Sequence, residues 1–380
     1  MRSRKPLVVL GSGPVGLVAA LRGRQLGMDV MVYTNSLGAP RESPRVECVP
    51  AQVVALLVEF GVSPKRLGVD TLFRQRTIQW AGGAVATSPA PDAAHIERPA
   101  LEIALLESAL RAGAKIDVLR EGLVQEFRRR HREGECMLLD ASGRSAVTAT
   151  ARIGPRRPLV ARLFHLPMRP SLRGSGLMIA AGPEGYAYRL ANAATLTLGV
   201  VGRKDFVRGD AAHIIEKVAQ FAPWLVENIP SAHMRPGASG AASAQWSVGG
   251  NFDSILVGDA SFARDALASQ GLAMGLSDAL KMFAQANKGV TAPPRSDEKK
   301  QISVHCQRIL QQLKRSAFGS ARSWVEYSEF LSDLVELMTA RAELADVEIP
   351  VIVDRRPYLE TPEPFAQIGV VHYDSAKASN

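Results

Sequence analysis

The sequence predicts an α/β protein in which a Rossmann-like domain is interleaved with a β-sheet domain and followed by a C-terminal helical cap. A glycine-rich turn lies between an apolar strand and an apolar helix near the first residue. Two later apolar strands end in acidic residues, Asp140 and Asp259, and a helical pattern runs over residues 301–344. With 380 residues, 46% of them hydrophobic, the chain can bury a sizeable core, which excludes a miniprotein or a disordered chain.

The chain carries more basic than acidic residues, 46 Lys and Arg against 37 Asp and Glu, for a formal net charge of +9. Such a charge is compatible with nucleic acid or an anionic membrane as a partner. Between residues 141 and 183, however, there is no Asp, Glu or Lys, but there are seven arginines. Arginine alone favours bidentate recognition of carboxylates or phosphates, so this stretch predicts a face that docks an acidic protein or peptide. The seven are Arg144, Arg152, Arg156, Arg157, Arg162, Arg169 and Arg173.

Three further features restrict the class of protein. The basic run at residues 128–132 is predicted as a solvated strand edge and hairpin, so no nucleic-acid partner is expected. Cys48, Cys136 and Cys306 are far apart and odd in number, which predicts neither a disulfide framework nor a metal pair. No apolar run reaches the roughly 18 unbroken residues of a membrane span. We therefore expect a cytoplasmic protein with no metal site and no membrane partner.

The first motif is a glycine-rich turn that an apolar strand precedes. A helix over residues 17–26 and a second strand over residues 30–33 follow it and complete a βαβ unit. Gly11 allows a tight turn, Gly13 lets the backbone approach a pyrophosphate, and Gly16 lets the helix pack on the strand. The unit predicts dinucleotide binding at the helix N-terminus; the plain alternative is an ordinary tight turn. The turn comprises Gly11, Ser12, Gly13, Pro14, Val15 and Gly16.

The end of the second strand departs from the usual pattern. An acidic residue that binds ribose hydroxyls is common there, but this chain has Thr34. A hydroxyl can do that work only weakly. We therefore expect Thr34 to be assisted by Arg41 or Arg45 at the adenosine end of the ligand.

Two later motifs place acidic residues at strand ends. A strand beginning at residue 136 ends in Asp140 and a glycine-bearing turn, for which an ordinary hairpin turn is the alternative. Another strand ends in Gly258 and Asp259, where the carboxylate can accept a hydrogen bond from a ligand hydroxyl. The amides of Gly271 and Leu272 then open a helix that can stabilise a negative charge.

Aromatic and histidine side chains offer weaker candidates. Core packing is the common fate of large aromatic residues, but four of them could line an aromatic substrate site. His95 and His165 are candidate general bases by residue type only, with a structural role as the alternative, and no catalytic base is identified. His305 lies within a predicted helix without evident partners and is assigned no role. The four aromatic candidates are Tyr186, Tyr188, Trp224 and Trp246.

The order of these motifs resembles the FAD-dependent monooxygenases of the para-hydroxybenzoate hydroxylase fold. The shared features are the glycine-rich turn, Arg98 before a helix, the turn at residues 140–144 and the late Gly-Asp strand end. Over residues 5–290 the details are most similar to the branch that contains tryptophan halogenases and the flavoproteins that mature tryptophylquinone enzymes. The marks of that branch are residues 140–144, 244–247 and 269–271.

The resemblance implies a Rossmann-like FAD-binding domain of the GR2 type formed by residues 1–160 and 251–290. It also implies a substrate-binding β domain at residues 161–250 and a helical cap and tail at residues 291–380. In the family the late Asp binds the ribityl chain of the cofactor, the next helix start faces the flavin pyrimidine, and the mid-chain Arg lies near the flavin and pyrophosphate. The residues implied to bind FAD are Gly11, Ser12, Gly13, Pro14, Val15, Gly16, Thr34, Arg41, Arg98, Asp140, Gly258, Asp259, Gln270, Gly271 and Leu272.

Two departures argue against halogenation. The Trp-x-Trp-x-Ile-Pro signature of halogenases is absent, and residues 221–230 hold at best a remnant of it. No lysine lies between Lys65 and Lys115, the region expected to carry a halogenase's catalytic lysine. The resemblance therefore favours an oxygenase over a halogenase.

The leading hypothesis is an FAD-dependent monooxygenase that hydroxylates an aromatic substrate, and in its sharper form a Trp side chain of a partner polypeptide in tryptophylquinone maturation. One alternative is a flavin-dependent oxidoreductase or hydroxylase of a small aromatic or lipid-like molecule. An alternative of another class is a non-catalytic flavin-binding or basic nucleic-acid-binding protein. No second glycine-rich turn marks a nicotinamide domain, so NAD(P)H binds transiently or a flavin reductase supplies the electrons.

Overall fold

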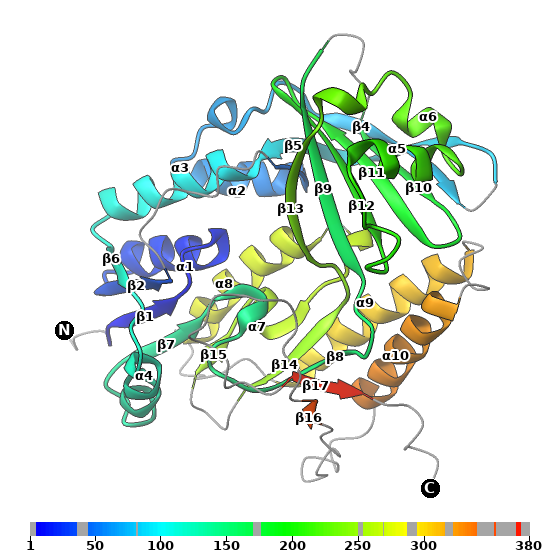
Figure 1. Ribbon diagram of the computed structural model, residues 1–380. Helices are drawn as coiled ribbons and strands as arrows, with labels where there is room; N and C mark the ends of the chain where they lie inside the picture. The colour runs from blue at the N-terminus through cyan, green and yellow to red at the C-terminus, as the bar shows by residue number, and fades with distance from the viewer. Residues whose placement is uncertain are drawn as a thin grey trace, which may run out of the picture.

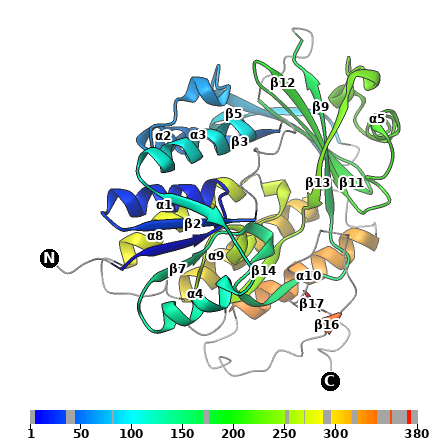
Figure 2. The same ribbon diagram turned by 60° about the vertical axis from the view of Figure 1, so that its left-hand side comes forward.

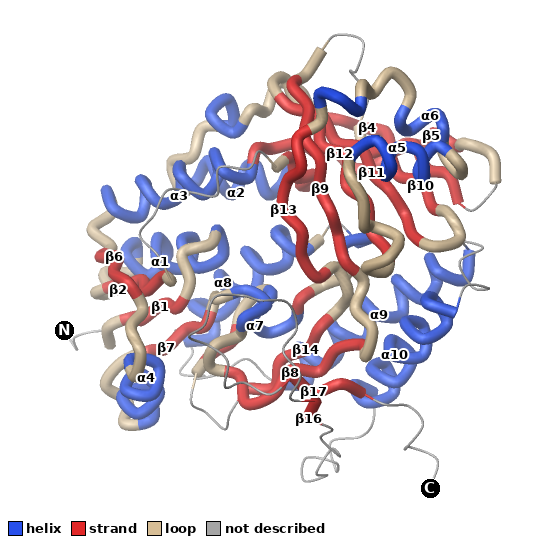
Figure 3. The backbone as a smooth tube through the Cα atoms, in the orientation of Figure 1, coloured by secondary structure: helices blue, strands red, loops and turns tan. Residues whose placement is uncertain are grey.

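The computed structural model describes most of the chain, as three β-sheets flanked by helices (Figure 1). Arg41 and Arg173, both named by the sequence analysis, lie outside the described residues. Figure 3 separates the helices from the strands along the same path. The described residues are 5–35, 45–80, 83–169, 176–249, 254–268, 270–286, 295–315, 322–339, 353–354 and 370–373.

Sheet A has five strands, and all neighbouring pairs are parallel. Its register pairs Leu10 with Asp140, and Asp140 with Leu256. The carboxyl ends of these three strands therefore meet at one edge, where ligands bind in open α/β sheets. In spatial order the strands are β15 (Ile255–Leu256), β7 (Met137–Asp140), β1 (Leu7–Leu10), β2 (Val30–Thr34) and β6 (Lys115–Val118).

Helices cover both faces of sheet A (Figure 2). Alternate residues of a strand point to opposite faces, so Leu7 and Val9 pack under one group of helices while Val8 and Leu10 pack against Phe127 on the other face. The two-sided covering explains why these strands are apolar throughout. The predicted α/β fold class is confirmed. The helices are α1 (Pro14–Gln25), α3 (Arg98–Arg111) and α8 (Gly271–Ala286) on one face and α4 (Leu123–Arg132) on the other.

Sheet B is a larger, mainly antiparallel sheet, with one parallel pair between β4 and β10. Three of its strands come from residues 46–97, so the interleaving of the two sheets starts well before residue 161, while the predicted domain boundaries stay a prediction. Its strands, in spatial order, are β13 (Arg235–Ala241), β9 (Val160–Pro167), β12 (Thr195–Gly202), β11 (Gly185–Ala191), β10 (Leu177–Ala181), β4 (Phe73–Trp80), β5 (Ala86–Glu97) and β3 (Val46–Pro50).

The two faces of sheet B have different partners. One face packs under two helices through a cluster that includes Phe164 and Leu198, whereas Tyr186 and Val201 on the other face pack against the helical cap. In the small sheet C, residues 370–373 pair with residues 152–155, which come shortly before β9 of sheet B in the chain. The remaining elements are α2 (Ala51–Glu59), α5 (Ala211–Ala219), α6 (Pro223–Val226), α7 (Asp259–Phe262), cap helices α9 (Arg295–Arg315) and α10 (Arg322–Thr339), and strands β14 (Gln245–Gly249), β8 (Ala149–Pro155), β17 (Val370–Tyr373) and β16 (Val353–Asp354).

The basic run at residues 128–132 forms the last turns of α4, so the predicted strand edge and hairpin are wrong. Apolar residues at helical spacing explain the difference: Leu123 and Phe127 pack against the core beside β1 and β7. Arg129 forms an ion pair with Glu133, one helical turn further on. The arginines thus lie on the solvated side of an amphipathic helix.

Among the residues that the structure describes, no helix is both long and apolar enough to cross a bilayer. The same part of the chain holds no group of three His, Cys, Asp or Glu that could bind a metal ion. The three cysteines are free thiols.

A buried hydrogen-bond network fastens the cap to the loop between α7 and α8. Asp265 in that loop accepts a hydrogen bond of 2.5 Å from the Tyr327 hydroxyl of α10 and one of 2.7 Å from its own loop, at the Leu267 amide. The amide of Asp265 in turn donates to Nε2 of His305 on α9, at 3.3 Å. Sequence analysis assigned His305 no partner; that expectation is wrong, because loop residue Asp265, some 40 positions earlier, supplies it.

Burial raises the pKa of Asp265 to about 6, although bonds from Tyr327 and Leu267 and the charge of Arg144 oppose the increase. Since the folded-state pKa lies above the ordinary value, protonation favours the fold at low pH and this stabilisation is lost as pH rises through about 6. Other titratable or charged groups lie around the Asp265 network, namely His305, Cys306, Tyr186, Tyr327, Arg144 and Arg264.

We therefore expect the pH dependence of stability to change in Asp265→Asn. The free energy of unfolding of the wild type, minus that of the variant, should fall by up to about 3 kcal/mol between pH 4 and pH 8. Urea unfolding followed by circular dichroism at several pH values measures this difference. The neighbouring groups are present in both proteins, so the difference isolates Asp265. A difference that is constant or rises with pH would contradict the assignment.

Candidate functional site

The first two motifs touch through their backbones at the edge of sheet A. Gly11 has φ +110° and its amide donates to the carbonyl of Tyr33 at 2.7 Å. A Cβ atom on Gly11 would lie 2.4 Å from the carbonyl oxygen of Ala141 and 2.9 Å from Cα of Ser142. Both the dihedral angle and the close approach require glycine, so the turn after β1 can lie against the turn after β7 only with this residue.

The third motif packs against the same turn through Val15. Its side chain packs against two adjacent glycines, Gly258 before α7 and Gly275 in the first turns of α8. A Cβ on Gly275 would lie 2.8 Å from Cγ2 of Val15 and 3.3 Å from Cα of Gly258. The first turns of α1 and α8 are thereby held close together, so the three motifs that sequence analysis selected form one site.

The N-terminus of α1 is suited to an anion. Gly13 is its N-cap residue, and no side chain in the described part of the chain caps the helix there. A Cβ built on Gly13 would have no atom within 4 Å, so the backbone at this point faces open space. Uncapped amides and the helix dipole favour a phosphate at such a position. Beside it, the Ser12 hydroxyl donates to Oγ1 of Thr34 at 2.9 Å and joins the turn to the end of β2.

The start of α8 provides the opposite side of the site. Asp259 is half-buried, and no described residue forms a hydrogen bond or ion pair with its carboxylate. Its Oδ1 lies 3.8 Å from the position of a Cβ on Gly271, the first residue of α8. The carbonyl of Gln270 accepts the amide of Met274, which starts the helix. A carboxylate that can accept ligand hydroxyls thus lies beside a helix N-terminus, with half-buried Leu272 next in the chain.

Asp140 has a different environment from Asp259. Its two carboxylate oxygens accept four hydrogen bonds, from the amide and hydroxyl of Ser142 and of Thr148, at 2.6 to 2.9 Å. These bonds shape the loop that touches Gly11. A direct cofactor contact of Asp140 stays a prediction, because its carboxylate is already engaged by the loop.

No protein-family model matches the chain, and no curated protein matches it. Solved structures do. The myxobacterial chondrochloren halogenase CndH, described as a new variant of FAD-dependent halogenases, is 18% identical, with a TM-score of 0.68 over 90% of this chain and 91% of that one. The peptidyl tryptophan dihydroxylase QhpG, essential for tryptophylquinone cofactor biogenesis, is 19% identical, with a TM-score of 0.55 over 88% of this chain and 73% of that one. A flavoprotein/dehydrogenase from Cytophaga hutchinsonii is 17% identical, with a TM-score of 0.61 over 87% and 92% of the two chains.

The chain has the fold of the FAD-dependent halogenases and hydroxylases. The resemblance predicted from the motif order is confirmed at the level of fold. The residues at the sheet edge also fit the cofactor of this fold, since open amides at Gly13 and an unpaired carboxylate at Asp259 are the groups that a pyrophosphate and a polyol chain require.

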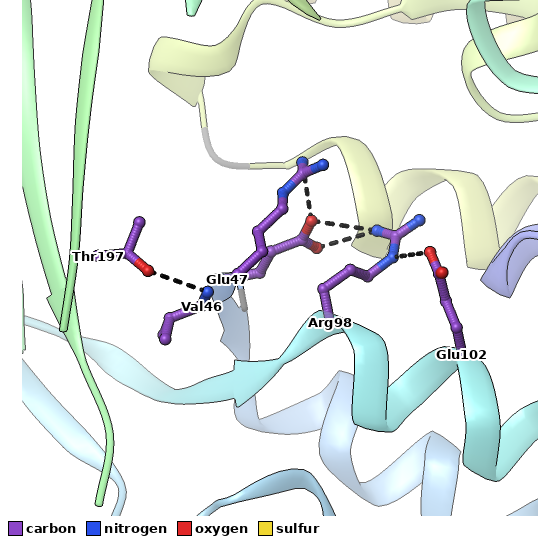
Figure 4. Close-up of polar contacts among 6 residues, drawn as sticks. Val46, Glu47, Arg98, Glu102 and Thr197 are labelled. Atoms are coloured by element: carbon purple, nitrogen blue, oxygen red, sulfur yellow. Dashed lines mark hydrogen bonds and ion pairs between the residues drawn. The ribbon is translucent and has the colours of Figure 1, made fainter. Parts of the chain in front are cut away.

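Arg98, which the sequence analysis expected near the flavin, is the first residue of α3. It pairs with Glu47 on β3 and with Glu102 one turn further along α3 (Figure 4). Arg45 also pairs with Glu47, at 2.9 Å. Sequence analysis did not select Glu47; the only signal was an ionisable residue in an otherwise apolar strand.

The candidate bases and aromatic residues are not brought together. His95 and His165 are buried in sheet B, and burial lowers the pKa of each to about 4, which makes them poor bases at neutral pH. Trp224 belongs to α6, donates to Gln79 and packs on the face of sheet B that α5 and α6 cover. Three candidates do share the cap side of the fold: Tyr186, Tyr188 and Trp246.

Several of the described arginines between residues 141 and 183 have partners within the chain, while docking of an acidic partner stays a prediction. Arg144 donates to the carbonyls of Ser243 and Arg264, at 2.8 and 3.3 Å. Arg162 donates to the carbonyls of Val207 and Gly209. A guanidinium has five N–H donors on a planar group and can therefore bind several backbone carbonyls at once. An arginine that donates to carbonyls within the chain does not require an acidic partner protein. Arg152 likewise donates to the carbonyl of Arg144, whereas Arg157, whose side chain is 53% exposed, forms an ion pair with Glu326.

The geometry predicts different effects on stability for substitutions at two glycines of the first motif, Gly11 and Gly13. Gly11→Ala should lower the free energy of unfolding of the apo-protein by more than about 2 kcal/mol, because of its positive φ and the contact with Ala141. Gly13→Ala should change it by less than about 1 kcal/mol, since its φ is −71° and the space around it is open. Chemical denaturation of both apo-variants checks the pair. Equal effects would mean that the turn is not packed as described.

Proposed function

We propose that this protein is an FAD-dependent monooxygenase that hydroxylates an aromatic substrate. The observation that carries the proposal is the convergence of three distant segments at one edge of sheet A. There, the open amides at Gly13, the unpaired carboxylate of Asp259 and the start of α8 at Gly271 face one site. The shared fold with FAD-dependent halogenases and a peptidyl tryptophan dihydroxylase supports the assignment.

Each group has a distinct role toward the cofactor. The α1 amides around Gly13 bind the pyrophosphate, and Asp259 accepts hydrogen bonds from the ribityl hydroxyls. The amides of Gly271 and Leu272 would stabilise negative charge on the pyrimidine. When bound, FAD would pass to dioxygen the two electrons received from NAD(P)H or from a flavin reductase. In the net reaction, one oxygen atom would be inserted into an aromatic C–H bond and the other would take up two protons and leave as water.

The face of sheet B that packs against the helical cap supplies the aromatic wall of the proposed substrate site. The ring of Tyr188 lies across Gly199 on the neighbouring strand, where a Cβ would meet it at 2.1 Å. Tyr186 lies two residues away on the same face. The likeness to QhpG supports a Trp side chain of a partner polypeptide as the substrate, in preference to a free small molecule.

Halogenation is the second candidate function, because CndH and the brominase Bmp2, with a TM-score of 0.63 and 14% identity, share the fold. The sequence between Lys65 and Lys115 includes β4, β5 and all of α3, and it contains no lysine. A halogenase of this fold needs a lysine that the resemblance places in that region. We therefore favour oxygen transfer.

The cofactor assignment can be tested by titrating the apo-protein with FAD and following flavin fluorescence. Asp259→Asn should raise Kd roughly tenfold or more, because it loses charge-assisted bonds to the ribityl hydroxyls. Gly13→Ala should also weaken binding, although its fold is intact, since the new methyl group occupies the open space. Exposed Asp29→Asn is the matched control and should leave Kd unchanged. Failure of the wild type to bind FAD would overturn the proposal.

The reaction class can be tested by co-expression with a quinoprotein subunit that carries the precursor Trp. Mass spectrometry should show one or two added oxygen atoms on that Trp, and co-expression with Asp259→Asn should not. Growth in medium rich in chloride and bromide provides the discriminating condition. Replacement of a ring hydrogen by a halogen would favour the second candidate and exclude the first.

A further inference from the structure

Glu47 is a nearly buried carboxylate placed between two guanidinium groups at the edge of the proposed cofactor site. Its Oε1 and Oε2 lie 3.2 and 3.1 Å from Nη1 of Arg98, and its Oε1 lies 2.9 Å from Nη2 of Arg45. The Glu47 side chain is only 14% exposed. Arg98 is held a second time, by Nε donating to Glu102 at 2.7 Å (Figure 4).

The backbone brings these side chains together from segments some 50 residues apart. Antiparallel pairing sets Glu47 opposite Ile96 in β5, two residues before Arg98. The amide of Arg98 donates to the carbonyl of Arg45 at 2.8 Å. On the other side, the amide of Val46 donates to Oγ1 of Thr197 in β12, at 3.2 Å. The start of β3 is therefore fixed both to α3 and to the inner strands of sheet B.

The cluster lies next to α8. Strand β3 contacts α8, and Val49 of β3 belongs to the same core as Leu276 of α8. Figure 4 shows the start of a helix behind Glu47 and Arg98, in the colour of α8. The cluster thus neighbours α8, at whose start the proposed function places the flavin.

Both members of the pair are charged at neutral pH. Burial opposes the charge of Glu47, but attraction to Arg98 and Arg45 outweighs it and holds the pKa of Glu47 below its ordinary value. Burial also opposes the charge of Arg98, but Glu47 and Glu102 outweigh it and raise its pKa. Loss of either partner leaves the other with only part of its charge compensation, because Glu47 then retains only Arg45 and Arg98 retains only Glu102.

The contacts with Glu47 and Glu102 leave the Nη2 group of the Arg98 guanidinium unused. Nε and Nη1 are occupied by the two carboxylates, whereas Nη2 has no partner among the described residues. A guanidinium held at two nitrogens cannot rotate freely, so the remaining N–H groups point in one fixed direction. Fixed donors bind an acceptor at a lower entropic cost than mobile ones.

We propose that Glu47 is a positioning residue that acts through Arg98 and presents the free Nη2 edge of its guanidinium to an acceptor group of FAD. The inference rests on the proposed function, since it requires FAD at the edge of sheet A. Glu47 itself needs no contact with the cofactor. Glu102 supports the same orientation from the more exposed side, so its loss should have a smaller effect.

A double-mutant cycle tests the inference, with the dissociation constant of FAD as the readout. Glu47→Gln should raise Kd about tenfold in the wild-type background, and less than about twofold in Arg98→Ala, because Glu47 acts through Arg98. Glu47→Asp, which retains the charge, should restore part of the affinity. If Glu47→Gln raises Kd equally in both backgrounds, or lowers only the melting temperature of the apo-protein, the inference is wrong.

Two further measurements keep the outcomes distinct. Glu107 on the same helix forms a bidentate but exposed pair with Arg66, at 2.6 and 2.7 Å, so Glu107→Gln is the matched control and should leave Kd unchanged. If Glu47→Gln does not fold, Glu102→Gln replaces it in the cycle and should raise Kd severalfold only when Arg98 is present. A wild type that does not bind FAD overturns the proposed function itself, whereas normal wild-type binding with no coupling overturns only the role of Glu47.

Discussion

The structure depends on close backbone packing at the edge of sheet A. Parallel register brings the ends of β1, β7 and β15 together, and no side chain separates Gly11 from Ala141 or Gly258 from Gly275. The side chain of Val15 packs against both Gly258 and Gly275. Because the three turns are this close, the amides of α1, the carboxylate after β15 and the start of α8 can face one ligand. A Cβ atom on Gly11 or Gly275 would push the three turns apart.

This edge could be predicted from the sequence because its determinants are local. A glycine between an apolar strand and an apolar helix specifies the turn whatever lies elsewhere in the chain. The acidic residues Asp140 and Asp259 were also visible at strand ends, although only the structure shows that Asp140 is engaged by its own loop and Asp259 is not. Pattern identifies the residue, while its hydrogen-bond partners decide whether it is available.

The features that could not be predicted depend on contacts between distant segments. Glu47 meets Arg98 only because β3 pairs with β5, and Asp265 meets Tyr327 only because α10 folds back over the α7–α8 loop. The basic run of α4 was misassigned for a related reason: its helix is selected by burial of Phe127 against sheet A. Local charge pattern contains no information about such partners.

The same reasoning changes the meaning of the net charge. Arginines that appear in the sequence as a positive cluster donate to internal carbonyls in the structure, so they contribute to packing between segments. At the proposed cofactor site, Arg45 and Arg98 are matched in number by Glu47 and Glu102, which leaves that cluster formally neutral. Attraction for an anionic cofactor must then come mainly from oriented donors, the helix amides at α1 and α8 and the free edge of Arg98. Orientation, unlike net charge, is lost when a single supporting carboxylate is removed.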